Sequence, residues 1–183
     1  MAFGIALALD SDLSAQVAAV WRQFEAAGVG KTPGEFEEPP HITLALFPSG
    51  DPMRLARLLD ETPFSDTSLA LTPFGAFLGD RHVLYYNVVL CPALLEAHAA
   101  LHARIRAENL PCDPLYSPGS IVFHCSLAME VEPQALSSGV EICLRNPQTR
   151  SGRAEAVELF EYFPVKSLHR RRLSCVRASG YPN

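Results

Sequence analysis

Two five-residue segments of this chain share a pattern of side chains suited to acid–base chemistry on an anion. Residues 41–45 (HITLA) match residues 124–128 (HCSLA) at four of five positions when serine and threonine are treated as equivalent, and 83 residues separate the two histidines. An imidazole has an ordinary pKa of about 6.5, so near neutral pH it can either accept or donate a proton. The repeated pattern therefore predicts His41 and His124 as a pair of catalytic residues.

Each segment opens a short apolar run that predicts a β-strand. Because alternate residues of a strand share a face, His41 would lie beside Thr43 and His124 beside Ser126, with the alanine that follows leaving room. The other face would point into the core and carry Ile42, Leu44 and Leu46 in one strand and Cys125, Leu127 and Met129 in the other. A hydroxyl can donate a hydrogen bond to a phosphate oxygen, so Thr43 and Ser126 are predicted phosphate ligands. Two such pairs across a cleft would supply the base, the acid and the donors that phosphodiester cleavage requires.

Three further residues are candidates for contacts with a substrate. The segment HRRR (169–172) lies in a predicted final strand, where alternation puts Arg170 and Arg172 on one face. These arginines would either line the cleft and bind the substrate phosphate or protect a solvated edge strand with charge. Tyr116 lies in a loop rich in Pro, Ser and Gly just before the second motif, where a nucleobase could stack on it.

His98 and His102 form a second histidine pair, four residues apart in a predicted helix. This spacing can bind zinc, but no glutamate follows His98 as in His-Glu-x-x-His motifs and no third ligand is evident. We therefore expect both side chains on a helix surface and expect no metal site there.

The pattern of apolar residues predicts the elements that must position these side chains. The order is β-α-loop-β-α-β followed by β-α-loop-β-α-β-β, which indicates two similar lobes that share one core in a single domain over 1–183. The predicted strands cover 3–10, 41–47, 68–79, 82–90, 121–129, 154–163 and 167–178, and the predicted helices cover the segment from Asp10 or Ser11 to Gly28, then 52–61, 93–110 and 133–145.

Composition narrows the class of protein. At 183 residues with 48% apolar side chains, the chain can bury a sizeable core, and its net charge of −5 disfavours binding of long duplex nucleic acid through a broad basic surface. No apolar run approaches the roughly 20 residues of a membrane span, and the N-terminus lacks the features of a secretion signal. Five scattered cysteines fit reduced thiols. We expect a monomer, located in the cytoplasm, that binds a small or locally held phosphate ligand.

The two motifs resemble those of the 2H phosphoesterase superfamily, and in particular its 2'-5' RNA ligase and 2',3'-cyclic phosphodiesterase group. Residues 40–44 (PHITL) are similar to the family's first motif, and residues 116–119 (YSPG) ahead of HCSLA resemble the lead-in to its second. The chain departs from the family at Phe123, where proline is usual, and at Ile121, where an aromatic residue is frequent. These departures bear on the identity of the substrate more than on catalysis.

The resemblance implies a bilobal α+β fold in which two antiparallel sheets flank a central cleft, with helices on the outside. It also implies that His41 and His124 are the acid–base pair, that Thr43 and Ser126 bind the phosphate, and that no metal or other cofactor is used. Members of the family open 2',3'-cyclic phosphates, cleave other cyclic or 2'-5' linked nucleotides, or join RNA ends. We therefore expect a metal-independent phosphodiesterase for a cyclic nucleotide or an RNA end; a non-catalytic binding module for such ligands and 2'-5' end joining are the alternatives.

Overall fold

Antiparallel strands form a single sheet in the order β2-β1-β6-β3-β4-β5, and β7 pairs with β6 outside this path. The computed structural model describes residues 1–162 and 165–174. The strands are β1 (Ala2–Leu9), β2 (His41–Phe47), β3 (Thr67–Phe77), β4 (His82–Val88), β5 (His124–Val131), β6 (Arg150–Tyr162) and β7 (Lys166–Arg172). The helices are α1 (Ser11–Ala27), α2 (Pro52–Glu61), α3 (Pro92–Ala107) and α4 (Leu136–Leu144), with short 3₁₀ turns η1 (Pro33–Phe36), η2 (Pro114–Tyr116) and η3 (Pro133–Ala135).

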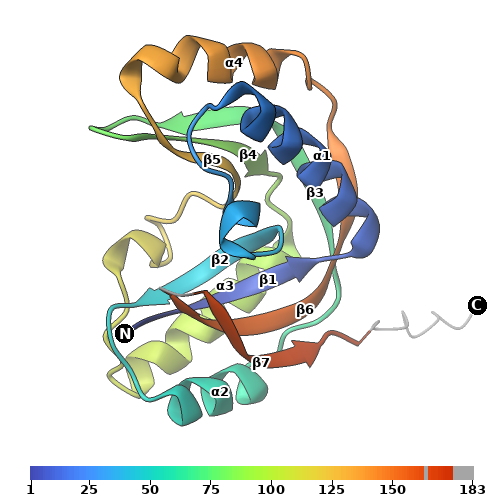
Figure 1. Cartoon of the computed structure of the whole chain (residues 1–183). Helices are drawn as coiled ribbons and strands as arrows, with labels where there is room; N and C mark the ends of the chain where they lie inside the picture. The colour runs from blue at the N-terminus through green and yellow to red at the C-terminus, as the bar shows by residue number, and fades with distance from the viewer. Residues whose placement is uncertain (163–164, 175–183) are drawn as a thin grey trace, which may run out of the picture.

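The two halves of this sheet are joined by its longest strands. The end of β6 that begins at Arg150 pairs with β3, and the rest of β6 pairs with β1, so hydrogen bonding continues from one half to the other. Figure 1 shows β4 and β5 at one end of β3 and β6, and β1 and β2 at the other. The predicted α+β fold of antiparallel strands with outer helices is confirmed, and the two predicted sheets are the two ends of one sheet.

The helices cover these halves in a crossed arrangement. In Figure 1, α4 lies above β4 and β5, and α2 lies below β7. Helix α1 packs against β5, β6 and α4, and α2 packs against β6, β7 and α3. The Trp21 indole of α1 donates a hydrogen bond to the Ser126 carbonyl of β5 at 3.0 Å, and the His102 ring of α3 donates one to the Leu44 carbonyl of β2 at 3.1 Å. A helix that precedes the first motif therefore supports the second motif, and a helix from later in the chain supports the first.

The first helix begins and ends as its sequence predicts. The carboxylate of Asp10 accepts a hydrogen bond from the Leu13 amide at 2.8 Å and caps the helix. Gly28 ends it with φ of 63°, a left-handed conformation that glycine adopts without a steric penalty. Between these caps, Leu13, Val17, Val20, Trp21 and Phe24 are buried at helical spacing.

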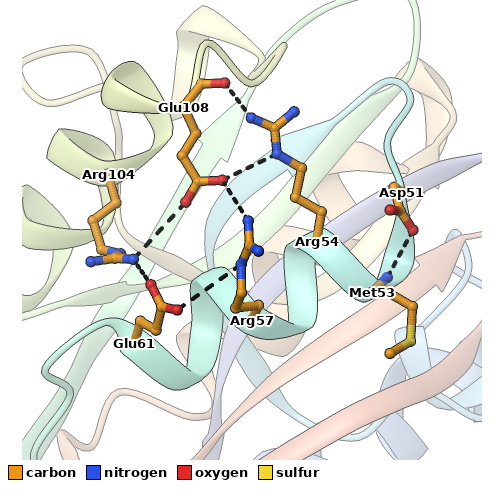
Figure 2. Close-up of polar contacts among 7 residues, drawn as sticks. All are labelled: Asp51, Met53, Arg54, Arg57, Glu61, Arg104 and Glu108. Carbon is orange, nitrogen blue, oxygen red and sulfur yellow. Dashed lines mark hydrogen bonds and ion pairs between the residues drawn. The ribbon is translucent and has the colours of Figure 1, made fainter.

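Charged side chains join helices α2 and α3. Figure 2 shows Glu108, just after α3, between Arg54 and Arg57 of α2, at 3.1 and 3.6 Å, and Arg104 of α3 beside Glu61 of α2. The carboxylate of Asp51 caps α2 by accepting a hydrogen bond from the Met53 amide at 3.0 Å. Exposed ion pairs contribute little singly, but these pairs form a network that connects α2 with the end of α3.

The predicted order of elements is confirmed, and most boundaries move by only a few residues. The predicted helix over 133–145 is divided into η3 and α4, and the last predicted strand ends as β7, while its residues 175–178 lie outside the described part of the chain. Among the described residues, no helix combines the length and apolar character needed to cross a membrane.

Candidate functional site

One cavity of about 640 Å³ brings the two motifs together. Its lining includes His41 and Thr43 from β2, His124 and Ser126 from β5, and Tyr116 from η2. Apolar side chains complete most of the wall, namely those of Ala2, Pro33, Leu46, Phe77, Val83, Leu115, Ile121, Val122 and Met129. Two imidazoles and two hydroxyls far apart in sequence therefore face one ligand-sized space, as the motifs predict.

A β-bulge at the same position in each motif changes which residue follows the hydroxyl in the cavity. In β2, Thr43 pairs with Ala6 and Ala45 with Ile5, so Leu44 is the extra residue. In β5, Ser126 pairs with Tyr85 and Ala128 with Leu84, so Leu127 is the extra residue. A bulge shifts the alternation of a strand by one residue. The prediction that Ala45 and Ala128 line the cleft is therefore wrong: both are buried, and Leu46 and Met129 line the cavity instead.

Both imidazoles are oriented by the same local hydrogen bond. The Nδ1 atom of His41 lies 2.9 Å from the Pro39 carbonyl, and that of His124 lies 2.7 Å from the Val122 carbonyl. Because a carbonyl oxygen can only accept, each Nδ1 carries a hydrogen and donates it. The other nitrogen, Nε2, is then the one that exchanges protons with a ligand in each ring.

The environment of His124 favours its neutral form. Burial lowers the pKa of His124, and the charge of the nearby His41 lowers it further, against the opposing effect of the Val122 carbonyl. The ring packs edge-on against Phe77 and lies 5.2 Å from the ring of Tyr85, between centroids. At neutral pH, His124 therefore presents an unprotonated Nε2 that can act as a base.

Two residues of the site were not predicted from the sequence. Glu38, only 6% exposed, has its Oε1 atom 3.4 Å from the Nε2 atom of His41 and lines the cavity. Tyr162 of β6 also lines it, and burial, followed by the charge of Glu38, raises the pKa of the Tyr162 hydroxyl. A carboxylate three residues before His41 was visible in the sequence, but Tyr162 reaches the site only through the pairing of β6 with β1.

The second histidine pair is buried, so its predicted place on a helix surface is wrong. His98 and His102 are only 3% and 2% exposed, and their ring centroids lie 4.3 Å apart. The Nε2 atom of His98 donates to the Tyr116 carbonyl at 2.9 Å, as that of His102 does to the Leu44 carbonyl. Within residues 1–162 and 165–174, no three His, Cys, Asp or Glu side chains gather as a metal site would require. These rings therefore fix the backbone near both Tyr116 and the first motif.

The structure places Arg170 and Arg172 outside the cavity, which corrects their predicted role. Arg170 lies between Glu155 and the buried Glu158, with its Nη1 atom 2.7 Å from Glu158, and Arg172 lines a separate hollow with acidic residues. Alternation along β7 was predicted correctly, since His169 faces the opposite way, toward Asp60 of α2. Carboxylates of the neighbouring strand β6 therefore hold Arg170 in place of a phosphate.

The described cysteines carry free thiols, namely Cys91, Cys112, Cys125 and Cys143. Burial raises the pKa of the Cys125 thiol, which adjoins His124 in the sequence, to about 12. This side chain is therefore a neutral part of the core behind the second motif. Cys175 lies outside the described residues.

The fold matches solved structures of small proteins over nearly their whole length. Escherichia coli LigT in complex with 3'-AMP has 14% sequence identity and a TM-score of 0.64, and the match covers 94% of this chain and 97% of that one. LigT in complex with NADP+ has 15% identity and a TM-score of 0.59, with 94% and 96% covered. The protein TT0787 of Thermus thermophilus has 16% identity and a TM-score of 0.66, with 97% and 100% covered.

At the level of sequence, no curated protein matches the chain. The family model of the 2'-5' RNA ligase superfamily does match, and it spans residues 10–163, which include both motifs. The chain therefore belongs to the 2'-5' RNA ligase superfamily of 2H phosphoesterases.

Proposed function

We propose that this protein is a metal-independent phosphodiesterase that acts on a cyclic nucleotide or on the 2',3'-cyclic phosphate end of an RNA. The observation that carries the proposal is the matched orientation of His41 and His124, each held through Nδ1 by a carbonyl two residues earlier, on the wall of one cavity. Membership of the 2H phosphoesterases supports it.

The arrangement supplies each group that hydrolysis of a cyclic phosphate needs. One imidazole takes a proton from the attacking water as its oxygen bonds to phosphorus, and the other protonates the ribose oxygen as its bond to phosphorus breaks. Thr43 and Ser126 line the same space and can donate hydrogen bonds to the non-bridging oxygens. The product is a phosphomonoester on one ribose oxygen. The other ribose oxygen is released as a free hydroxyl.

The rest of the cavity suits the uncharged parts of a nucleotide. Among the described residues that line it, none is lysine or arginine, and most are apolar. Nearby basic side chains are paired, as Lys31 is with Glu130 at 2.9 Å. Tyr116 is placed to stack on a nucleobase, and the complexes of LigT with 3'-AMP and NADP+ show that this fold can hold nucleotides.

The proposed activity can be tested with a panel of phosphodiesters. Purified protein is incubated with 2',3'-cyclic, 3',5'-cyclic and 2'-5' linked nucleotides, with and without EDTA, and products are identified by chromatography and ³¹P NMR. We expect ring opening of at least one cyclic substrate at the same rate in EDTA. Binding of these nucleotides without any turnover would instead identify a non-catalytic module, and loss of turnover in EDTA would contradict the metal-independent chemistry.

Removal of either hydroxyl at the site is expected to slow the reaction. The variants Thr43→Val and Ser126→Ala each lose a hydrogen bond to a charged phosphate, worth about 10- to 100-fold in kcat/KM. Ser68→Ala, at an exposed position of β3, is the matched control and should leave kcat/KM unchanged. A loss of less than twofold in both site variants would show that these hydroxyls do not contact the reacting phosphate.

A further inference from the structure

The buried His98 and His102 of α3 contact two different parts of the candidate site. Each ring donates from Nε2 to a backbone carbonyl, His98 to that of Tyr116 at 2.9 Å and His102 to that of Leu44 at 3.1 Å. Burial lowers the pKa of His98 to about 4 and also lowers that of His102, so both rings are neutral near pH 7. Polar rings are costly to bury, and each of these two uses its N–H on a segment that lines the cavity.

His102 holds the first motif at the bulge of β2. Leu44 is the extra residue of that bulge and directly follows Thr43, which lines the cavity. Strand β2 lies at one end of the sheet, where backbone groups on the outer side lack a neighbouring strand. His102 supplies a donor for the Leu44 carbonyl and thereby fixes the backbone next to the Thr43 hydroxyl.

A matching contact holds the second motif at its own bulge. The Trp21 indole of α1 donates to the Ser126 carbonyl at 3.0 Å, and Ser126 directly precedes the extra residue Leu127. Strand β5 lies at the other end of the sheet from β2. Each motif strand therefore receives one side-chain donor from a helix where its bulge interrupts the regular pairing.

His98 holds both ends of the loop that forms one wall of the cavity. Residues 116–123 connect η2 to β5. Four of them line the cavity, namely Tyr116, Ser120, Ile121 and Val122. At the first end of the loop, His98 binds the Tyr116 carbonyl, and at the second end its ring packs edge-on against Phe123, with 5.0 Å between the ring centroids. One imidazole thus fixes the spacing between the two ends of this wall.

We propose that the two histidines are positioning residues with separate effects: His98 sets the loop that meets the nucleobase, and His102 sets the bulge beside the hydroxyl that meets the phosphate. The kinetic consequences rest on the proposed function, but the positions of both segments can be followed without a substrate. A general loss of packing in α3 would impair binding and turnover together. Separate roles would change KM in one variant and kcat in the other.

Kinetics with and without a nucleobase on the substrate test this separation. The variants His98→Leu and His102→Leu are compared with the wild type on 2',3'-cyclic AMP and on ribose 2',3'-cyclic phosphate. In His98→Leu, we expect KM for 2',3'-cyclic AMP to rise about 10-fold through weaker stacking, while kcat and the KM for the compound without a base stay within about twofold. In His102→Leu, we expect kcat to fall about 10-fold on both substrates, because the Thr43 hydroxyl is displaced, while KM changes little.

Three further variants show whether the hydrogen bonds carry these effects. Glutamine keeps an N–H close to the place of Nε2, so His98→Gln and His102→Gln should recover most of each loss. Leu101→Val removes one methylene group from the buried part of the same helix and should leave kcat and KM within about twofold of the wild type. Leucine variants that change kcat and KM alike on both substrates, or glutamine variants that recover nothing, would overturn the proposal.

Backbone amide NMR spectra of the free proteins separate failure of this proposal from failure of the proposed function. We expect His98→Leu to shift the signals of residues 116–123 and His102→Leu to shift those of residues 41–46, with both glutamine variants close to the wild type. If these shifts are seen but the wild type turns over neither substrate, the positioning of both segments stands and the proposed function fails. Shifts that spread alike over both segments in the two leucine variants would refute the separate roles.

Discussion

Replacement of either His41 or His124 by alanine is expected to lower kcat/KM by about 10²- to 10⁴-fold, the usual contribution of a general acid or base. Each ring is the only part of its motif that can exchange a proton near neutral pH, because the side chains of Thr43 and Ser126 carry hydroxyl groups, which do not ionise in this range. Both rings line the cavity and are only partly buried, so the variants should fold. Initial rates at several substrate concentrations measure the effect.

His169→Ala provides the matched control for loss of an imidazole. His169 of β7 faces α2, where it lies 2.7 Å from Asp60, and it does not line the cavity. Its removal costs one hydrogen bond at the surface and should leave kcat/KM within about twofold of the wild type. Alanine variants of His41 and His124 that matched this control would refute the proposed chemistry.

Acidification is expected to destabilise the fold through the buried histidines of α3. Burial, and secondarily the charge of His102, lowers the pKa of His98 to about 4, and burial lowers that of His102. An unfolded chain has a histidine pKa of about 6.5, so between these values the unfolded state binds more protons and stability falls as the pH falls. From pH 7 to pH 4, His98 alone accounts for a loss of about 3 kcal/mol.

Urea denaturation at pH 7, 5.5 and 4 measures this loss. Because Glu and Asp side chains also titrate at the lower pH and change the stability, a reference variant is needed. His98→Gln removes the titrating ring and keeps an N–H donor for the Tyr116 carbonyl. We expect the wild type to lose about 3 kcal/mol more than His98→Gln over this range. Equal losses in the two proteins would show that His98 is not held neutral in the fold.

The sequence was sufficient to predict which residues meet in the site but not their full surroundings. His41, Thr43, His124 and Ser126 could be predicted because each pair opens an apolar strand with a spacing of two. The paired bulges at Leu44 and Leu127 could not, because a bulge depends on how a strand pairs with its neighbour.

The residues that surround the motifs could not be predicted, because contacts between segments distant in the sequence bring them to the site or keep them away from it. Tyr162 reaches the first motif because β6 pairs with β1, and nothing near Tyr162 in the sequence indicates this. Arg170 had the right charge for a phosphate, but the pairing of β7 with β6 brings Glu158 opposite it. A spacing of four residues suits both a metal site and a buried pair, so the sequence could not reveal that His98 and His102 hold backbone carbonyls.

The kcat/KM of the double variant His41→Ala/His124→Ala, compared with those of the two single variants, tests most directly whether both imidazoles act on one phosphate. Residues that act as a unit in one transition state are far from additive when they are removed together. We therefore expect the double variant to be about as slow as the slower single variant. Losses that multiply, so that the double variant is slower by the product of the two single effects, would contradict a shared site of action.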